Sequence, residues 1–250
     1  MNFQERKKII LQMTDLKGSV SVNEIAESLQ ISEITVRRDL AILSEKGLIY
    51  RTHGGAMKVS LAKDSFSFAN KVAVNVENKD YICGLANGYI KDGQTIFIDC
   101  GSTVFRLCEL VRNKQIKLIT NSLPVVYELI NSQVSINLIG GELDKDRNAV
   151  HGKMAEEHIC RYKADYAFIG TDGISIKNGL SANSELEAGI TQSMIQNSNK
   201  VILLCDSTKL EKDKYFKFAP LSSISTILTD KKADDGILKK YKKEKIEIIN

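Results

Sequence analysis

The sequence predicts an α/β fold in two parts: an N-terminal winged helix-turn-helix domain and a Rossmann-like, mainly parallel α/β domain. Residues 1–57 contain three short helical patterns, the last two joined by a tight turn and followed by a Gly-Gly step. Residues 75–250 alternate short apolar, β-branched runs with helical patterns, which is typical of a parallel sheet covered by helices. Between them, residues 58–74 lack strong periodicity and are expected to form a linker.

The bulk composition is that of an ordinary globular protein. The chain has 250 residues, of which 43% are hydrophobic and 26% charged, and its net charge of +4 permits nucleic-acid binding without requiring it. No apolar run approaches the roughly 20 residues that a membrane span needs. The N-terminus lacks the layout of a signal peptide. A cytoplasmic protein without a membrane partner is therefore expected.

The cysteines and histidines predict no metal chemistry. The five cysteines are scattered without any CxxC pair, and the three histidines form no ligand pattern. Neither a disulfide framework, nor a metal site, nor a cofactor is therefore predicted. The lysine-rich stretch 239–245 is interpreted as a solvated helix face.

The N-terminal domain, called the head below (residues 1–57), begins with a helical pattern over residues 5–16. A short β-like step near Val20 precedes a second helix, for which Asn23 is the expected N-cap. Ser32 is expected to cap a third helix that ends at Gly47. Two helices joined by a tight turn, the second longer and carrying adjacent arginines, form the helix-turn-helix arrangement.

The third helix is expected to enter the major groove of DNA. Val36, Leu40 and Leu43 are spaced to face the core, which leaves the polar side chains outward. Residues 48–51 and the turn at 52–56 predict a β-wing that contacts backbone phosphate. The expected DNA-contacting residues are Ser32, Glu33, Thr35, Arg37, Arg38, Arg51 and His53.

Charge alone leaves an alternative open for this head. Residues 1–57 carry eight basic and seven acidic side chains, a net charge of only +1. A small helical bundle with a solvated charged face would have the same balance. The DNA-binding interpretation depends on where the arginines lie, not on their number.

The first predicted strand of the α/β domain, residues 95–99, leads through Gly101 into a helix that starts at Ser102. The unpaired N–H groups and partial positive charge of a helix N-terminus suit a phosphate. Gly101 lets an anion approach the backbone. The structural alternative is that Ser102 simply caps the helix.

Four further strands are followed by small, polar or glycine-rich residues, at 121–122, 140–142, 171–173 and 207–209. Because ligands of parallel sheets bind beyond the carboxyl ends of the strands, these segments predict one pocket for a polar, anionic small molecule. A lysine there would neutralise a phosphate, and carboxylates, among them Glu142, would accept sugar hydroxyls. The expected ligand-binding residues are Asp99, Gly101, Ser102, Thr103, Asn121, Ser122, Gly140, Gly141, Asp172 and Lys209.

Motifs in both parts resemble the DeoR family of bacterial winged-helix repressors of sugar-use operons. They are VNEIA at 22–26, TVRRDL at 35–40, HGGA at 53–56, DCGST at 99–103 and DSTK at 206–209. The resemblance implies a sensor domain related to ribose-5-phosphate isomerase, with operator DNA and a phosphorylated sugar as partners. It also implies that Gly101, Ser102 and Thr103 hold phosphate, with Asn121, Ser122 and Lys209 nearby.

We therefore expect a DNA-binding transcriptional regulator, a repressor of a carbohydrate-utilisation operon, whose operator affinity is controlled by a phosphorylated sugar. A symmetric homo-oligomer is expected, since paired heads read paired half-sites. No enzymatic activity is expected. One alternative is a sugar-phosphate isomerase with an accessory DNA-binding head, in which Asp99, Asp172 or Glu185 moves a proton. Another is a redox-responsive regulator that uses Cys100 or Cys108.

Overall fold

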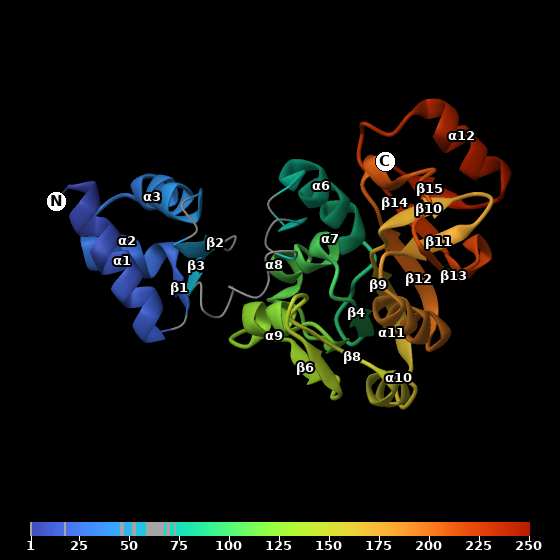
Figure 1. Ribbon diagram of the computed structural model, residues 1–250, viewed down its shortest axis with the longest axis horizontal. Helices are drawn as coiled ribbons and strands as arrows, with labels where there is room; N and C mark the ends of the chain where they lie inside the picture. The colour runs from blue at the N-terminus through green and yellow to red at the C-terminus, as the bar shows by residue number, and fades with distance from the viewer. Residues whose placement is uncertain are drawn as a thin grey trace. The chain divides into compact units, whose positions relative to one another are not determined.

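The computed structural model describes residues 2–17, 19–45, 48–51, 54–58, 68, 71–72 and 74–250. The chain divides into two compact units, Met1–Asn70 and Lys71–Asn250 (Figure 1). The division falls within residues 58–74, the stretch expected to be a linker. In the described part of the chain, no helix is both long and apolar enough to cross a bilayer.

The described part of the first unit is a bundle of helices with a small β-sheet, as the sequence predicts. Its helices are α1 (Phe3–Lys17), α2 (Val22–Leu29) and α3 (Glu33–Glu45). Ile10, Ile25, Val36, Leu40 and Leu43 are fully buried between them. The antiparallel sheet has the order β1 (Ser19–Ser21), β3 (Gly55–Lys58), β2 (Ile49–Arg51).

Two details of this unit differ from the sequence-based expectation. Ser21, not Asn23, is the N-cap of α2, because its side chain accepts the Glu24 N–H while Glu24 accepts the Ser21 N–H, a reciprocal capping box. Strand β3 also starts inside the stretch expected to be a turn. Gly55 pairs there with Ser21 of β1, and an added Cβ would lie 1.9 Å from the Val20 carbonyl oxygen.

The second unit is built on a seven-stranded sheet with the order β15-β14-β12-β9-β4-β5-β6, in which every pairing is parallel. This confirms the mainly parallel sheet. The strands are β4 (Thr95–Ile98), β5 (Lys117–Thr120), β6 (Ser135–Leu138), β9 (Ala164–Ile169), β12 (Ser198–Leu204), β14 (Thr226–Leu228) and β15 (Glu247–Ile249).

Helices cover both faces of this sheet. Phe97, Ile169 and Leu203 belong to the core cluster that includes Ala188 and Met194 of α11. Because side chains alternate along a strand, their buried neighbours face the other side of the sheet, where α6 packs against β12 and β14. The helices are α6 (Val76–Asn87), α7 (Ser102–Phe105), α8 (Cys108–Val111), α9 (Leu123–Leu129), α10 (Lys153–Ile159), α11 (Glu185–Gln196) and α12 (Asp235–Lys243).

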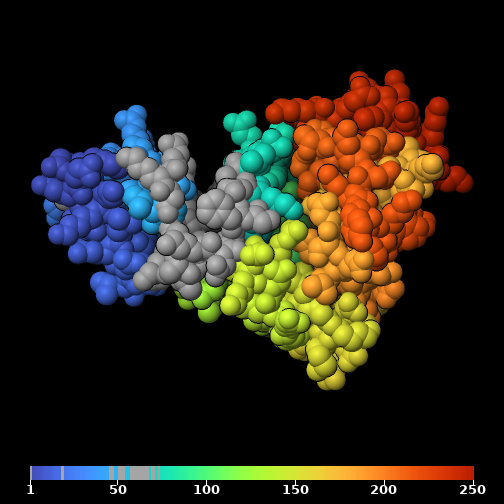
Figure 2. Space-filling view, viewed as in Figure 1, coloured from blue at the N-terminus to red at the C-terminus, as the bar shows by residue number. Residues whose placement is uncertain are grey.

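Helix α12 carries the lysine-rich stretch and lies on the surface of its unit, in red in Figure 2. Leu238 and Tyr241 are buried, whereas Lys239, Lys240 and Lys242 are exposed. The interpretation of this stretch as a solvated helix face is confirmed.

Three features of the second unit were not predicted. The helix expected from Ser102 is two short helices, α7 and α8, separated at Arg106 and Leu107. A hairpin, β7 (Glu142–Asp144) and β8 (Ala149–His151), follows β6. A small antiparallel sheet adds β10 (Gly173–Ser175), β11 (Gly179–Ala182) and β13 (Phe216–Ala219). These additions lie next to the strand ends in the sequence and supply side chains to the site described below.

Candidate functional site

Helix α3 presents the predicted DNA-facing side chains to solvent. Ser32 caps the helix by accepting the Thr35 N–H at 3.3 Å, which confirms the expected cap. Ser32, Glu33, Arg37 and Arg38 are exposed, while Val36 on the opposite side is fully buried. This helix therefore has one packed face and one polar, cationic face.

The arginines of α3 are held differently. Arg37 pairs with Glu33 one turn earlier, at 3.3 Å, so its guanidinium must leave that carboxylate to reach DNA. Arg38 makes no hydrogen bond or ion pair with any other described residue. Its five N–H donors are therefore available to a phosphate or a base edge.

Sequence reasoning missed Ile34, whose side chain is 78% exposed on the same helix. An apolar side chain at this place is suited to contact a thymine methyl group. Its position between Glu33 and Thr35, two residues expected to contact DNA, was the signal that could have identified it. Arg51 ends β2, and His53 lies outside the described residues, so the expected wing contacts remain predictions.

Asp99 links the carboxyl ends of two neighbouring strands in the second unit. Its carboxylate accepts the Gly101 N–H at 2.8 Å and the Gly170 N–H, which follows β9, at 2.6 Å. Burial raises the pKa of Asp99 to about 6, although both N–H groups and Lys209 oppose that shift. Asp99 therefore shapes the loop before Ser102, and both of its oxygens are already occupied by backbone donors.

A buried lysine, Lys79 of α6, lies against the start of α7. Its ammonium group donates to Ser102 Oγ at 3.2 Å and to the backbone carbonyl of Lys71. Only 4% of Lys79 is exposed, and no carboxylate of the described residues forms an ion pair with it. Burial, then the positive charge of Lys209, lowers the pKa of Lys79 to about 8. This is a buried cation paired only with neutral oxygens.

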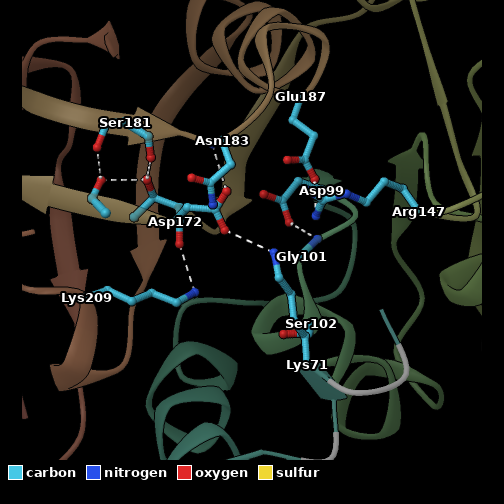
Figure 3. A network of polar contacts seen from close by, with 12 residues as sticks. Lys71, Asp99, Gly101, Ser102, Arg147, Asp172, Ser181, Asn183, Glu187 and Lys209 are labelled. Carbon is cyan, nitrogen blue, oxygen red and sulfur yellow. Dashed lines mark hydrogen bonds and ion pairs between the residues drawn. The ribbon is translucent and has the colours of Figure 1, made fainter. Parts of the chain in front are cut away.

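Asp172, after β9, lies in the same network (Figure 3). Its carboxylate accepts from Lys71 Nζ at 3.1 Å and from the Asn183 N–H at 3.0 Å. Burial alone would raise the pKa of Asp172, but Lys71, the Asn183 N–H and Lys209 together hold it below its usual value. Lys209, after β12, donates to the Thr171 carbonyl at 2.8 Å.

A second ion pair borders this network. Arg147, from the β7–β8 hairpin, meets Glu187 of α11 at 2.7 Å, and both are largely buried. Burial raises the pKa of Glu187, while Arg147 opposes that shift. Figure 3 draws Asp99, Asp172, Glu187 and Arg147 close together. The side chains of Lys71 and Lys209 lie beside them in this view.

The remaining predicted residues lie at neighbouring strand ends. Asn121 is fully buried and donates to the Val150 carbonyl at 3.0 Å, while its side-chain oxygen has no hydrogen-bond partner. Ser122 caps α9 through the Val125 N–H. Thr103 is buried, and its hydroxyl also has no partner. Two unpaired buried oxygens at one sheet edge are unusual in a folded protein.

Gly140 and Gly141 contact a different part of the unit. The Gly140 N–H donates to His158 Nδ1 at 3.1 Å, and Gly141 packs against Ala155 and the His151 carbonyl. They follow β6, which is separated from β4 by β5. Their contacts connect the sheet edge to α10 and not to Ser102.

Sequence reasoning missed Lys71, Lys79, Arg147, Asn183 and Glu187. Lys71 and Lys79 precede the first strand of the sheet, so no strand-end rule includes them. Arg147 belongs to the hairpin that was not expected. The only sequence signal for these residues was their chemistry, namely charged or polar side chains scattered among apolar patterns.

Of the two cysteines named in the redox alternative, Cys108 is buried and Cys100 is half-buried. Burial raises the pKa of both Cys100 and Cys108 above the usual thiol value. The thiolate is the reactive species, so these environments disfavour redox chemistry. The described residues also contain no cluster of histidine, cysteine and carboxylate groups able to hold a metal ion.

Comparison with known proteins assigns both units. A family model described as the DeoR-like helix-turn-helix domain matches residues 6–61, and one described as the DeoR C terminal sensor domain matches residues 74–231. The lactose phosphotransferase system repressor of Staphylococcus epidermidis is 36% identical over 252 residues, covering 99% of this chain and 97% of the relative. The HTH-type transcriptional regulator GlpR of Haloferax volcanii is 32% identical, covering 97% and 94%.

Solved structures resemble part of this chain. The ribose 5-phosphate isomerase A of Methanocaldococcus jannaschii is 19% identical, with a TM-score of 0.41. The match covers 54% of this chain and 55% of that chain, about half of each.

A winged helix with an outward cationic face, joined to a parallel sheet with polar strand ends, defines a DNA-binding transcriptional regulator. The chain belongs to the DeoR family. Its relatives are named as transcriptional regulators and repressors, so this protein is a regulator and not an enzyme. The predicted family, fold class and regulatory function are confirmed, and the isomerase alternative is set aside.

Proposed function

We propose that this protein represses a carbohydrate-utilisation operon and that a phosphorylated sugar controls its affinity for the operator. The observation that carries the proposal is Lys79, a buried ammonium group at Ser102 to which the described residues offer no anionic partner. Relatives named for a phosphotransferase system repressor support a sugar as the effector class.

The phosphate end of the effector belongs at Lys79, Ser102 and Lys209. A phosphate dianion accepts charge-assisted hydrogen bonds, which are stronger than those to a neutral carbonyl or hydroxyl. Because α7 has only four residues, the lysines supply most of the positive charge and the helix dipole little. The free hydroxyl of Thr103 supplies a further donor.

The sugar end belongs at two carboxylates, one after β9 and one in the first turn of α11. Asp172 and Glu187 accept hydroxyl donors, and Asn183 and Arg147 border them. Asp99 contributes by fixing the loop, since its oxygens already bind Gly101 and Gly170. The remaining predicted residues, Asn121 and Ser122, line the adjacent strand end.

A thermal-shift screen of the full chain tests this proposal. Hexose 6-phosphates and pentose 5-phosphates are compared with the same sugars without phosphate. We expect stabilisation by at least one phosphorylated sugar and by no unphosphorylated one. Ser102→Glu is expected to remove the response, because its carboxylate would pair with Lys79 and repel phosphate. A response that Ser102→Glu retains contradicts the proposed site.

For the DNA-binding unit, we propose that Ser32, Glu33, Thr35, Arg37 and Arg38 read the operator. Arg51 and His53 are proposed to contact backbone phosphate. A symmetric homo-oligomer in the cytoplasm is proposed as the working form, since paired heads match paired half-sites.

Arg38→Ala tests the DNA face most simply. It is expected to weaken binding to a duplex selected by the protein by about 1–3 kcal/mol if the side chain reads a base. Arg161→Ala, which removes an exposed arginine just after α10, serves as the charge-matched control. Equal affinities for Arg38→Ala, Arg161→Ala and the parent chain exclude the proposed recognition helix.

A further inference from the structure

Lys71 makes two hydrogen bonds in the candidate effector site, one as a donor and one as an acceptor. Its side-chain ammonium pairs with Asp172 at 3.1 Å, and its backbone carbonyl accepts the ammonium of Lys79. In Figure 3 a dashed line joins the ammonium group of Lys71 to the carboxylate of Asp172. One residue therefore engages both the cationic and the anionic part of the site.

Lys71 lies in the sequence at the boundary between the two units of the chain. Lys71 is the first residue of the second unit, and the polypeptide before it leads to the DNA-binding unit. Its side chain is 42% exposed, whereas Lys79 beneath its carbonyl is almost fully buried. A ligand that binds the Lys79 ammonium therefore competes for it with that carbonyl.

The two partners of Lys71 are the groups that a phosphorylated sugar would use. A neutral carbonyl is a weaker acceptor for an ammonium group than a phosphate dianion is. The carboxylate of Asp172 accepts a sugar hydroxyl as readily as it accepts Lys71 Nζ. Both bonds that hold Lys71 can thus be exchanged for bonds to one ligand.

We propose that Lys71 competes with the effector for Lys79 and Asp172, so that effector binding detaches the start of the second unit from the sheet edge. This inference rests on the proposed function of the site. It assigns the coupling between effector and DNA to one named residue, through a differential contact of the kind that a conformational shift requires.

Lys71→Met tests the competition by the sign of its effect. The variant keeps an unbranched side chain one atom shorter, together with the backbone carbonyl, but removes the ion pair with Asp172. Binding of inorganic phosphate to the full chain is measured by calorimetry. Competition predicts tighter binding, by about two- to fivefold, the equivalent of a partly exposed ion pair. If Lys71 were instead a direct phosphate ligand, loss of its charge would weaken binding.

Two control variants complete the measurement. Lys71→Arg keeps the ion pair and is expected to bind phosphate as the parent chain does. Lys209→Met removes a proposed phosphate ligand and is expected to bind more weakly. Unchanged or weaker binding by Lys71→Met overturns the inference while leaving the proposed function intact. Absence of phosphate binding in the parent chain and in Lys71→Met contradicts both.

A fluorescent reporter gives a second readout. The chain contains no tryptophan, and Val74, three residues after Lys71, is 57% exposed. In a Val74→Trp chain, phosphate is expected to change the tryptophan emission. The same chain with Lys71→Met is expected to show a smaller change, because its segment is already loosened. Saturation with phosphate without any emission change in the Val74→Trp chain overturns the inference.

Discussion

The guanidinium of Arg6 in α1 holds the carboxylate of Asp39 in α3 by two hydrogen bonds, from Nε to Oδ2 at 2.5 Å and from Nη2 to Oδ1 at 3.0 Å. Asp39 is 2% exposed and lies directly after Arg38 on the proposed recognition helix. This ion pair fixes the rotation of α3 against α1. The aspartate of the TVRRDL motif is therefore structural, whereas the arginines before it face outward.

Loss of this pair is expected to destabilise the DNA-binding unit. Arg6→Met removes both of these hydrogen bonds from the buried carboxylate of Asp39, so it is expected to lower the unfolding free energy more than the control variant does. Lys17→Met, which removes an exposed pair with Glu24, is the control and is expected to cost about 0–1 kcal/mol. Chemical denaturation monitored by circular dichroism measures both, and equal losses would contradict the anchoring role of Arg6.

The two glycines of the HGGA motif are expected to differ sharply. A Cβ at Gly55 would lie 1.9 Å from the Val20 carbonyl oxygen, whereas a Cβ at Gly54 meets nothing within 4 Å. Gly55→Ala must push β3 away from β1, and overpacking of this kind costs about 1–3 kcal/mol or more. Gly54→Ala is expected to be close to neutral. Thermal unfolding of the two variants distinguishes them, and similar melting temperatures would refute the close strand approach.

Asp99→Asn is expected to cost about 1–3 kcal/mol, because an amide cannot accept both the Gly101 and the Gly170 N–H groups. Asp92→Asn, an exposed carboxylate whose Oδ1 accepts one N–H from Gln115, is the control.

The pKa of Asp99, raised by burial to about 6, adds a pH signature. The folded chain binds this proton more tightly than the unfolded chain, so this group's contribution to stability falls as the pH rises from about 4 to 6. Asp99→Asn should remove that slope; its persistence would contradict the assignment.

Phosphate binding is expected to depend on the charge of Lys79. Burial lowers the pKa of Lys79 to about 8, so the ammonium form is lost above that pH. A sugar phosphate, like other phosphate monoesters, is mainly a dianion above about pH 6, so its affinity should be highest between about pH 6 and 8. Above pH 8 it should fall by up to about tenfold per pH unit. Calorimetry from pH 7 to 9.5 measures this, and Lys79→Met should lack the step. A parent chain with a flat profile would argue against Lys79 as the phosphate ligand.

Local patterns were sufficient to predict much of the fold. β-branched runs such as residues 95–98 predicted buried parallel strands, and the spacing of Val36, Leu40 and Leu43 predicted the packed face of α3. The strand-end rule also located Asp99, Asp172 and Lys209 correctly at the carboxyl edge of the sheet. These features depend on residues close together in the sequence.

The remaining features depend on packing between distant segments. Lys79 meets Ser102 across 23 positions, and Lys71 meets Asp172 across 101. No periodicity or motif near either lysine indicates these contacts. Gly140 was expected at the site by its strand-end position, but the order of the sheet places it two strands away from β4. Strand order is set by the whole sheet and could not be derived from one sequence.

The most direct test of the account is whether a sugar phosphate acts on DNA binding through Lys79. A labelled duplex selected by the full chain from a random library is titrated with and without the hexose or pentose phosphate that stabilises the protein. We predict that this ligand changes the affinity of the parent chain for the duplex by about fivefold or more. Relative to its own affinity without ligand, Lys79→Met should show no change. An equal shift in both proteins, or none in the parent chain, would contradict the account.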